Sequence, residues 1–159
     1  MKKYLKDILL VAATCLLLVN LSSFRFITAK TVDGDAVTGV WKTGEGTAMV
    51  KIYKNGEKYE GKIVWLKEPN DASTGLPKKD KNNPKETNRQ QPVLGLINVW
   101  GFVYDGKNEW EDGNIYDPKT GNEYSCTMTL KDNNNLEVRG YVGISLFGRT
   151  DVWKRQVQK

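Results

Sequence analysis

The chain has 159 residues, with 24 Lys or Arg against 19 Asp or Glu, two Cys and no His. This length fits one domain, and a composition of 39% hydrophobic and 27% charged residues is typical of a folded globular protein. The absence of His excludes Ser-His-Asp and Cys-His catalysis and His-ligated metal sites. Two Cys are too few for a Cys-based zinc site or a disulfide-dense scaffold.

The N-terminal residues 1–29 have the pattern of a signal peptide. Three lysines in the first six residues precede an apolar run over 8–21, which is short for a membrane span. Cleavage after Ala29 leaves a single domain of residues 30–159, exported to the periplasm or secreted, with no stable membrane span. Two alternatives stay open: an uncleaved N-terminal anchor, and lipidation at Cys15, which the continuing apolar run disfavours.

Charge and cysteine content change once this leader is set aside. The remaining residues carry 20 positive and 18 negative charges, a net charge of +2. So small an excess gives little reason to expect a nucleic-acid partner. Cys126 is then the single cysteine, which excludes an internal disulfide. We expect no cofactor.

The rest of the chain consists of short β-type segments joined by turns. Segments rich in β-branched and aromatic residues occupy 40–43, 48–54, 59–66, 94–104, 114–116, 124–130, 136–142 and 150–157. Asn55-Gly56 lies between two of them and is a strong hairpin signal, because both residues tolerate a positive φ. The pattern predicts an all-β fold, an antiparallel up-and-down barrel of about eight strands whose closure removes exposed strand edges.

Residues 67–92 interrupt this pattern after the third strand. They hold four of the five prolines and many Lys, Asn and Asp residues. We expect a long loop mostly outside the barrel. Five basic residues fall within 78–89, and this stretch is either a solvated surface or a contact for an anionic partner such as a phosphate-bearing envelope lipid.

The two ends of the β-rich region carry a recognisable pair of motifs. Gly39-Val40-Trp41 opens the first strand, and Trp153 and Arg155 fall in the last. This arrangement resembles the closed end of lipocalin and calycin barrels, where the Arg packs over the Trp. A cation over an indole face gains about 0.5–2 kcal/mol. Gly39, Trp41, Trp153 and Arg155 are therefore expected to close one end of the barrel.

Longer sequence blocks extend from Gly39 to Arg155. They are GVWKT at 39–43, GKIVWL at 61–66, DKNNP at 80–84, GNIYDP at 113–118, LEVRGY at 136–141 and GRT at 148–150. With these blocks the chain resembles the domain-of-unknown-function 2147 family, a set of secreted bacterial proteins with a lipocalin-like barrel. The resemblance implies this fold and export from the cell, but no biochemical activity.

The inward faces of the strands are the candidate binding surface. Strict alternation predicts that a small hydrophobic or amphipathic ligand is bound by Tyr59, Ile63, Trp65, Tyr124, Cys126, Met128 and Val138. The alternative is that these side chains, with Leu136, fill the barrel. The protein would then be an envelope or secreted interaction protein that acts through the 67–92 loop and the barrel rim. The sequence identifies neither the ligand nor a protein partner.

Catalysis and metal binding are not expected. A glycosidase needs two carboxylates across a cleft, and although the chain has many carboxylates, the sequence does not show which of them could form such a pair. Cys126 lies on an apolar face, where burial raises the pKa of a thiol and makes it unreactive. The acidic groups at 33–35 and 109–112 lack the spacing of a calcium loop, so no metal site is predicted.

Overall fold

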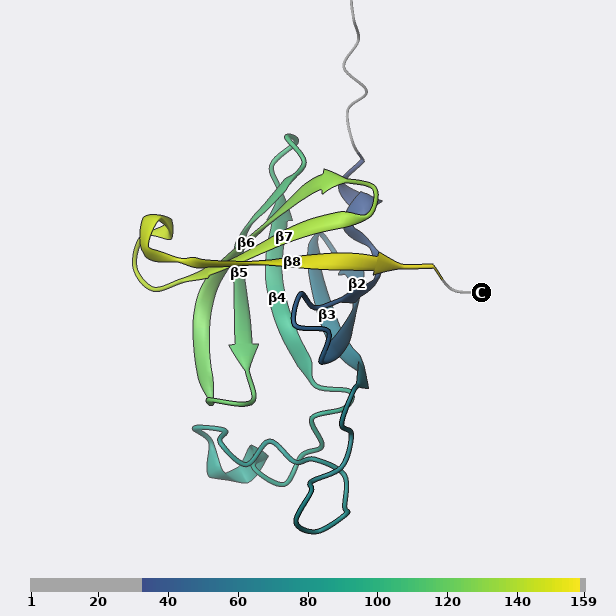
Figure 1. Cartoon of the computed structure of the whole chain (residues 1–159). Helices are drawn as coiled ribbons and strands as arrows, with labels where there is room; N and C mark the ends of the chain where they lie inside the picture. The colour runs from purple at the N-terminus through teal and green to yellow at the C-terminus, as the bar shows by residue number, and fades with distance from the viewer. Residues whose placement is uncertain (1–32, 158–159) are drawn as a thin grey trace, which may run out of the picture. The chain divides into compact units, whose positions relative to one another are not determined.

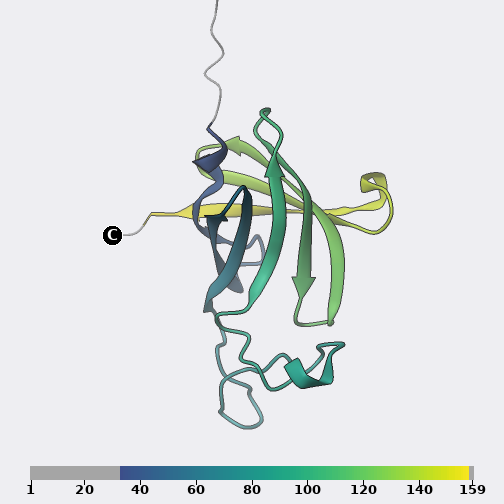
Figure 2. The same ribbon diagram turned by 180° about the vertical axis from the view of Figure 1, so that it is seen from behind.

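The chain forms a closed antiparallel barrel of eight strands, in which β1 also pairs with β8 (Figures 1 and 2). The computed structural model describes residues 33–157. The strands are β1 (Gly39–Lys42), β2 (Ala48–Asn55), β3 (Lys58–Leu66), β4 (Ile97–Tyr104), β5 (Glu109–Asp117), β6 (Asn122–Asp132), β7 (Asn135–Tyr141) and β8 (Arg149–Gln156). The predicted all-β, up-and-down barrel is confirmed. The predicted signal peptide, 1–29, lies outside the described residues.

Two strands differ from their predicted limits by more than two residues. The fourth begins at Ile97 because the preceding residues belong to the long loop. The expected strand at 114–116 is the nine-residue β5, which includes the Asp112-Gly113 pair, a dipeptide typical of turns. Asp112 instead takes a positive φ of 57° within a register shift of the β5–β6 pairing. The pair is therefore a bulge inside the strand and not a turn.

A second bulge lies near the end of β3. Val50 pairs with Ile63 and Met49 pairs with Trp65, so Val64 is an extra residue in the strand. The extra residue shifts the alternation, and Trp65 becomes exposed on the outside with the Lys42 ammonium 5.7 Å from its ring centroid. The expected inward position of Trp65 is wrong, because strict alternation cannot be carried through a bulge.

Large side chains fill one end of the barrel. Trp41, Phe102, Trp110 and Met128 are fully buried and belong to a single hydrophobic cluster. Protein interiors of this kind are close-packed and leave no room for a ligand. At this end the inward side chains fill the barrel, as the alternative to a binding site predicted.

A short 3₁₀ helix, η1 (Gly34–Val37), covers the filled end. The indole Nε1 of Trp110 donates to the Gly34 carbonyl at 3.1 Å, and Nε1 of Trp41 donates to the Val37 carbonyl at 2.8 Å. The Tyr59 hydroxyl donates to the Asp35 carboxylate at 2.7 Å. Burial, together with this bond, raises the pKa of Tyr59. Each buried polar tip thus has a partner in or beside η1, as its burial requires.

Arg155 completes the closed end. Its guanidinium lies 4.1 Å from the centroid of the Trp41 ring and donates to the carbonyls of Thr38 at 2.7 Å and Ala36 at 2.6 Å. A Cβ on Gly39 would lie 2.8 Å from Nη1 of Arg155. The Gly-x-Trp motif therefore has a steric reason: the glycine leaves room for the arginine that lies over the tryptophan.

The 67–92 loop lies at the other end of the barrel, outside its strands (Figure 1). Isolated β-bridges join Asn70 to Pro77 and Lys79 to Pro92, and a 3₁₀ turn, η2 (Glu86–Asn88), lies in the stretch that the second bridge encloses. The loop is thus folded against itself and not merely a solvated excursion. Among the described residues, no helix is both apolar and long enough to cross a membrane.

Candidate ligand-binding site

A cavity of about 1010 Å³ occupies the end of the barrel opposite η1. Its wall combines the start of β2, the end of β3 and the start of β4 with the end of β7 and the start of β8. Because neighbouring strands are antiparallel, these positions all belong to the same end of the barrel. Part of the 67–92 loop borders the cavity as well. Ligand pockets in proteins typically measure about 300–1,000 Å³, so the space suffices for a small molecule.

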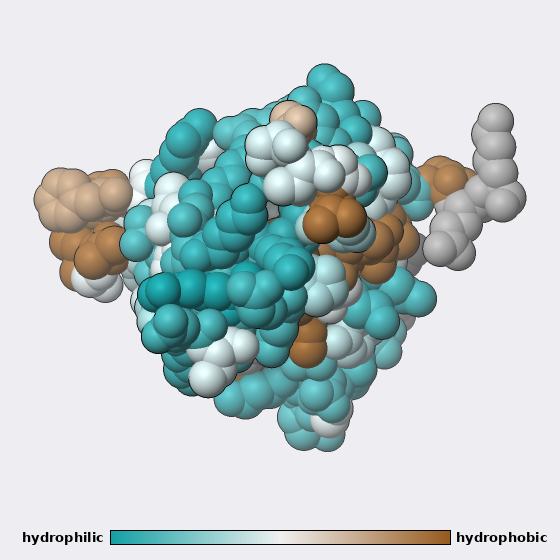
Figure 3. All heavy atoms as spheres, turned by 90° about the horizontal axis from the view of Figure 1, so that it is seen from below, coloured by the Kyte–Doolittle hydropathy of each residue, from teal (hydrophilic) through white to brown (hydrophobic). Residues whose placement is uncertain are grey.

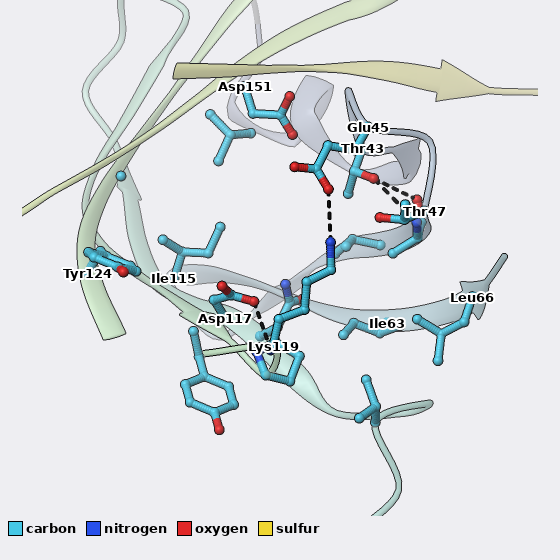
Figure 4. A pocket seen from close by; sticks show the side chains of 18 of the residues that line it. Thr43, Glu45, Thr47, Ile63, Leu66, Ile115, Asp117, Lys119, Tyr124 and Asp151 are labelled. Atoms are coloured by element: carbon cyan, nitrogen blue, oxygen red, sulfur yellow. Dashed lines mark hydrogen bonds and ion pairs between the residues drawn. The ribbon is translucent and has the colours of Figure 1, made fainter. Parts of the chain in front are cut away.

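The inner wall of the cavity is mainly apolar. Its side chains come from five or more strands and include Val50, Ile63, Leu66, Ile115, Val138 and Trp153. Tyr124 adds a phenol, and Figure 4 shows it beside Ile115, across the opening from Ile63 and Leu66. At Gly140 the β7 wall of the cavity has no side chain. A Cβ built there would lie 3.4 Å from its nearest atom, on Ile115, and 3.7 Å from the next, on Tyr124. A methyl group would therefore fit at position 140, in ordinary van der Waals contact with the cavity wall.

The mouth of the cavity is charged. The lining includes the basic residues Lys67, Lys78, Lys79, Lys81, Lys119 and Arg149 and the acidic residues Glu45, Glu68, Asp71, Asp117 and Asp151. Nζ of Lys119, from the β5–β6 turn, lies 2.9 Å from the carboxylate of Glu45 in the β1–β2 loop (Figure 4). This hydrogen bond holds the pKa of the Glu45 carboxyl below its usual value. Two turns that are distant in sequence are thus joined across the mouth.

Other charged residues of the rim form ion pairs within the 67–92 loop, while some basic residues of the rim have no carboxylate partner. Lys78 pairs with Glu68 at 3.2 Å, and Lys81 pairs with Asp71 at 2.5 Å. The bond from Lys81 lowers the pKa of the Asp71 carboxyl. Within residues 33–157 the rim residues Lys67 and Arg149 form no ion pair with a carboxylate at 4.0 Å or less. The mouth can therefore offer positive charge to the polar end of a bound molecule.

Asp80 fastens the loop to the barrel. Its side chain is fully buried, and it accepts hydrogen bonds at 2.7 Å from the Tyr116 hydroxyl of β5 and from the Asn83 amide. Burial, followed by the bond to Asp80, raises the pKa of Tyr116 to about 12. This contact gives a structural role to the Asp80-Lys81-Asn82-Asn83-Pro84 block. In the sequence the block was a family match without a role.

The structure divides the predicted binding residues into three groups. Ile63, Tyr124 and Val138 line the cavity. Tyr59, Cys126 and Met128 are buried in the packed core and do not line it. Trp65 lies outside the barrel. The barrel has its cavity at the end opposite η1 and packed side chains at the end beneath η1, so alternation identified inward positions without showing which end they occupy.

Trp153 was expected to close the barrel with Trp41 and Arg155, but it lines the cavity at the opposite end. It is nearly fully buried, lines the cavity wall, and its Nε1 donates to Asp151 at 2.9 Å. Sequence reasoning missed Val50, Ile115 and the rim residues of the turns as lining positions. Alternation along β2 and β5 was available as a signal for the first two, but the bulge in β5 obscures it.

Two further groups of potential chemistry lie away from the cavity. The carboxylates of Asp105, Glu109 and Glu111 come within 4.8 Å of one another at the β4–β5 turn, but they are exposed or half-buried and have no further ligand-like feature. Cys126 is a free, fully buried cysteine, and burial raises the pKa of its thiol to about 12. Neither group forms a site with the cavity.

An eight-stranded antiparallel barrel with one packed end and one hollow, charged-rimmed end defines a lipocalin-like protein. Among solved structures, the chain is similar to protein HP1028 from the human pathogen Helicobacter pylori, which is described as belonging to the lipocalin family. The two share 23% sequence identity with a TM-score of 0.65, over 76% of this chain and 82% of that one. At this identity the likeness shows the fold.

The family follows from the sequence match. Residues 39–155 match the family described as "Uncharacterized protein conserved in bacteria (DUF2147)", and the chain belongs to that family. No curated protein matches the chain significantly. The family description states no activity, so a function has to be argued from the cavity.

Proposed function

We propose that this protein is a non-catalytic carrier that holds a small amphipathic molecule in the hollow end of its barrel. The observation that carries the proposal is the cavity of about 1010 Å³ with an apolar interior and a charged mouth. A pocket of this kind fits a ligand whose apolar part is removed from water and whose polar end remains at the rim.

The distribution of lining residues supports one orientation of the ligand. The apolar part would lie against Ile63, Ile115, Val138 and Trp153, where the wall is apolar. The polar end would lie at the mouth, where Arg149 and other cations are available. An anionic end group suits this rim better than a cationic one, because basic lining residues are slightly more numerous than acidic ones.

Export is part of the proposal and is supported by the sequence of residues 1–29 alone. A carrier outside the cytoplasm would move its ligand between membranes or through an aqueous compartment, where a poorly soluble molecule needs shielding from water. Intact-mass analysis of protein recovered from the bacterial envelope or medium tests this directly.

The binding site is tested with a substitution in the cavity wall that places a large side chain in the cavity. A dansyl-labelled undecanoic acid is titrated into the protein, and then into Gly140→Phe, whose new ring would occupy the space beside Ile115 and Tyr124. We expect the affinity to fall at least roughly tenfold, about 1.4 kcal/mol. The matched control is Val152→Phe, which adds the same ring to a partly exposed position of β8 that does not line the cavity and should leave binding unchanged.

The orientation has its own measurement. The alcohol of the same chain length replaces the acid in a displacement assay against the dansyl probe. Arg149→Gln should weaken the acid more than the alcohol. No saturable binding below roughly millimolar, about −4 kcal/mol, or equal binding by the parent and Gly140→Phe, would show that the cavity is not the ligand site.

A further inference from the structure

The connection between β7 and β8 presents apolar side chains to water. Residues 142–147, called here the apolar tip, include Val142, Ile144, Leu146 and Phe147, with exposed fractions of 73%, 59%, 75% and 79%. Figure 1 shows the connection projecting sideways from the barrel, and Figure 3 shows its brown surface standing apart at the left. So many exposed large apolar residues in one loop indicate an interaction surface.

The apolar tip has a defined backbone support. Arg139 donates through Nε and Nη2 to the Ser145 carbonyl at 2.9 and 2.6 Å, and through Nη2 to the Leu146 carbonyl at 3.2 Å. Its Nη1 donates to the Thr150 hydroxyl at 2.8 Å. These bonds hold the 3₁₀ turn η3 (Ser145–Phe147) in place. The hairpin backbone therefore holds the apolar side chains of the tip in exposed positions.

Gly148 is part of the same support. A Cβ at this position would lie 2.7 Å from the Gly140 carbonyl oxygen and 2.9 Å from Cβ of Tyr141. A larger residue would push the two arms of the hairpin apart. The LEVRGY and GRT blocks of the sequence thus both serve to position the tip, a role that the cavity does not account for.

Within the hairpin segment 138–150 the charged side chains are all basic. Between Glu137 and Asp151 the chain carries Arg139 and Arg149 and no carboxylate. Both arginines lie at the base of the hairpin, next to the apolar residues. A tip of apolar side chains with arginines behind it matches the layering of an anionic membrane, in which phosphates overlie the acyl chains.

The size and position of the tip also favour a membrane over a protein partner. A stable protein interface takes roughly 800 Å² and 20–30 residues on each side, whereas this projection has six residues. A lipid surface, in contrast, deforms around a narrow projection. Val142, Phe147 and Arg149 also line the mouth of the cavity, so an inserted tip would bring that mouth to the lipid surface.

We infer that the apolar tip docks this protein onto anionic phospholipid membranes, with the apolar side chains inserted among the acyl chains and Arg139 and Arg149 at the phosphates. This docking does not depend on whether the cavity holds a ligand. The two ideas can therefore fail separately.

The experiment places a fluorescent reporter on the tip. The full chain carrying Phe147→Trp is mixed with vesicles of phosphatidylglycerol and phosphatidylcholine, with and without brominated acyl chains. We expect emission from the introduced indole to shift to shorter wavelength and to be quenched by the brominated lipid. Because this quenching acts at contact distance, it reports insertion of the tip even if another segment also holds the protein to the vesicle. The parent protein supplies the background from native Trp residues.

Matched variants distinguish insertion from proximity. Lys107→Trp, on the exposed β4–β5 turn, should show no quenching by brominated lipid. Adding Leu146→Asp to Phe147→Trp should lower tip insertion roughly tenfold or more, because a charge replaces a large apolar group. Arg149→Gln should lower it roughly fivefold on anionic vesicles and little on pure phosphatidylcholine.

Three results would overturn the inference. The first is an unquenched indole at position 147 at protein and lipid concentrations up to millimolar. The second is equal quenching in Lys107→Trp. The third is a blue-shifted indole without vesicles that returns to longer wavelength on dilution, which would assign the tip to contacts between two copies of the chain.

Discussion

Two glycines on inward faces of the barrel provide a direct test of its division into a packed and a hollow end. A Cβ on Gly113 would lie closer than 3.0 Å to three atoms of the fully buried Phe102 ring. A Cβ on Gly140 would make only ordinary contacts, at 3.4 and 3.7 Å. The same substitution, Gly→Ala, should therefore have opposite effects at the two positions.

The magnitudes follow from two terms. Replacing Gly by Ala within a strand stabilises the fold by about 0.5–1 kcal/mol, because Ala loses less conformational freedom on folding. Overpacking a close-packed core costs about 1–3 kcal/mol. Gly140→Ala should thus raise the free energy of unfolding by about 0.5–1 kcal/mol, whereas Gly113→Ala should lower it by about 1–2 kcal/mol.

Urea denaturation followed by Trp fluorescence measures both effects. With a slope of about 1–3 kcal/mol per molar urea, the midpoints of the two variants should differ by roughly 1 M. Phe102→Leu should recover part of the loss in the Gly113→Ala background, which a double-mutant cycle would show as coupling. Equal shifts for Gly113→Ala and Gly140→Ala would refute the division of the barrel into two different ends.

Four other measurements address the closed end, the loop contact, the cysteine and the leader. Trp41→Ala should lower the free energy of unfolding by about 3–5 kcal/mol, and Arg155→Ala should also lower it; unchanged urea midpoints for both would contradict the closure. Because the pKa of Tyr116 is raised from 10.0 to about 12 in the folded state, its contribution to stability is complete below pH 10 and is lost as the pH rises through 12; Tyr116→Phe should make that loss smaller in pH-dependent urea titrations. The Cys126 thiol, with its pKa raised to about 12, should resist a thiol-reactive disulfide reagent at pH 8 and react once urea unfolds the protein; rapid labelling of the folded protein would contradict its burial. Intact mass of the exported protein should lack residues 1–29, and retention of Met1 would contradict cleavage.

The barrel was predictable because its signals are local. Alternation over β6 and β7 and the Asn55-Gly56 hairpin each depend on neighbouring residues only, and antiparallel neighbours follow from short turns. The bulges at Val64 and Asp112 were not predictable in this way. Each bulge leaves one extra residue unpaired, and its position depends on the register with a particular partner strand, which lies elsewhere in the chain.

The candidate site was only partly predictable for a related reason. Inward faces could be recognised from alternation, but the boundary between filled and hollow ends depends on which large side chains meet in space. Trp110 lies outside the strand segments recognised from the sequence, and it fills the closed end against η1. Asp80 was placed in a solvated loop, yet it is buried against Tyr116. Both contacts join residues more than 30 positions apart.

The contacts of Arg139 with the β7–β8 hairpin distinguish the residues that set the shape of the hairpin from the side chains that the hairpin exposes. Its guanidinium binds main-chain oxygens of Ser145 and Leu146, which every amino acid possesses. The shape of the hairpin is therefore set at its base and by Gly143, whose φ of 73° favours glycine, while the other side chains at its end can change without disturbing the barrel. This makes residues 144–147 a natural position for grafting foreign peptides while keeping the fold.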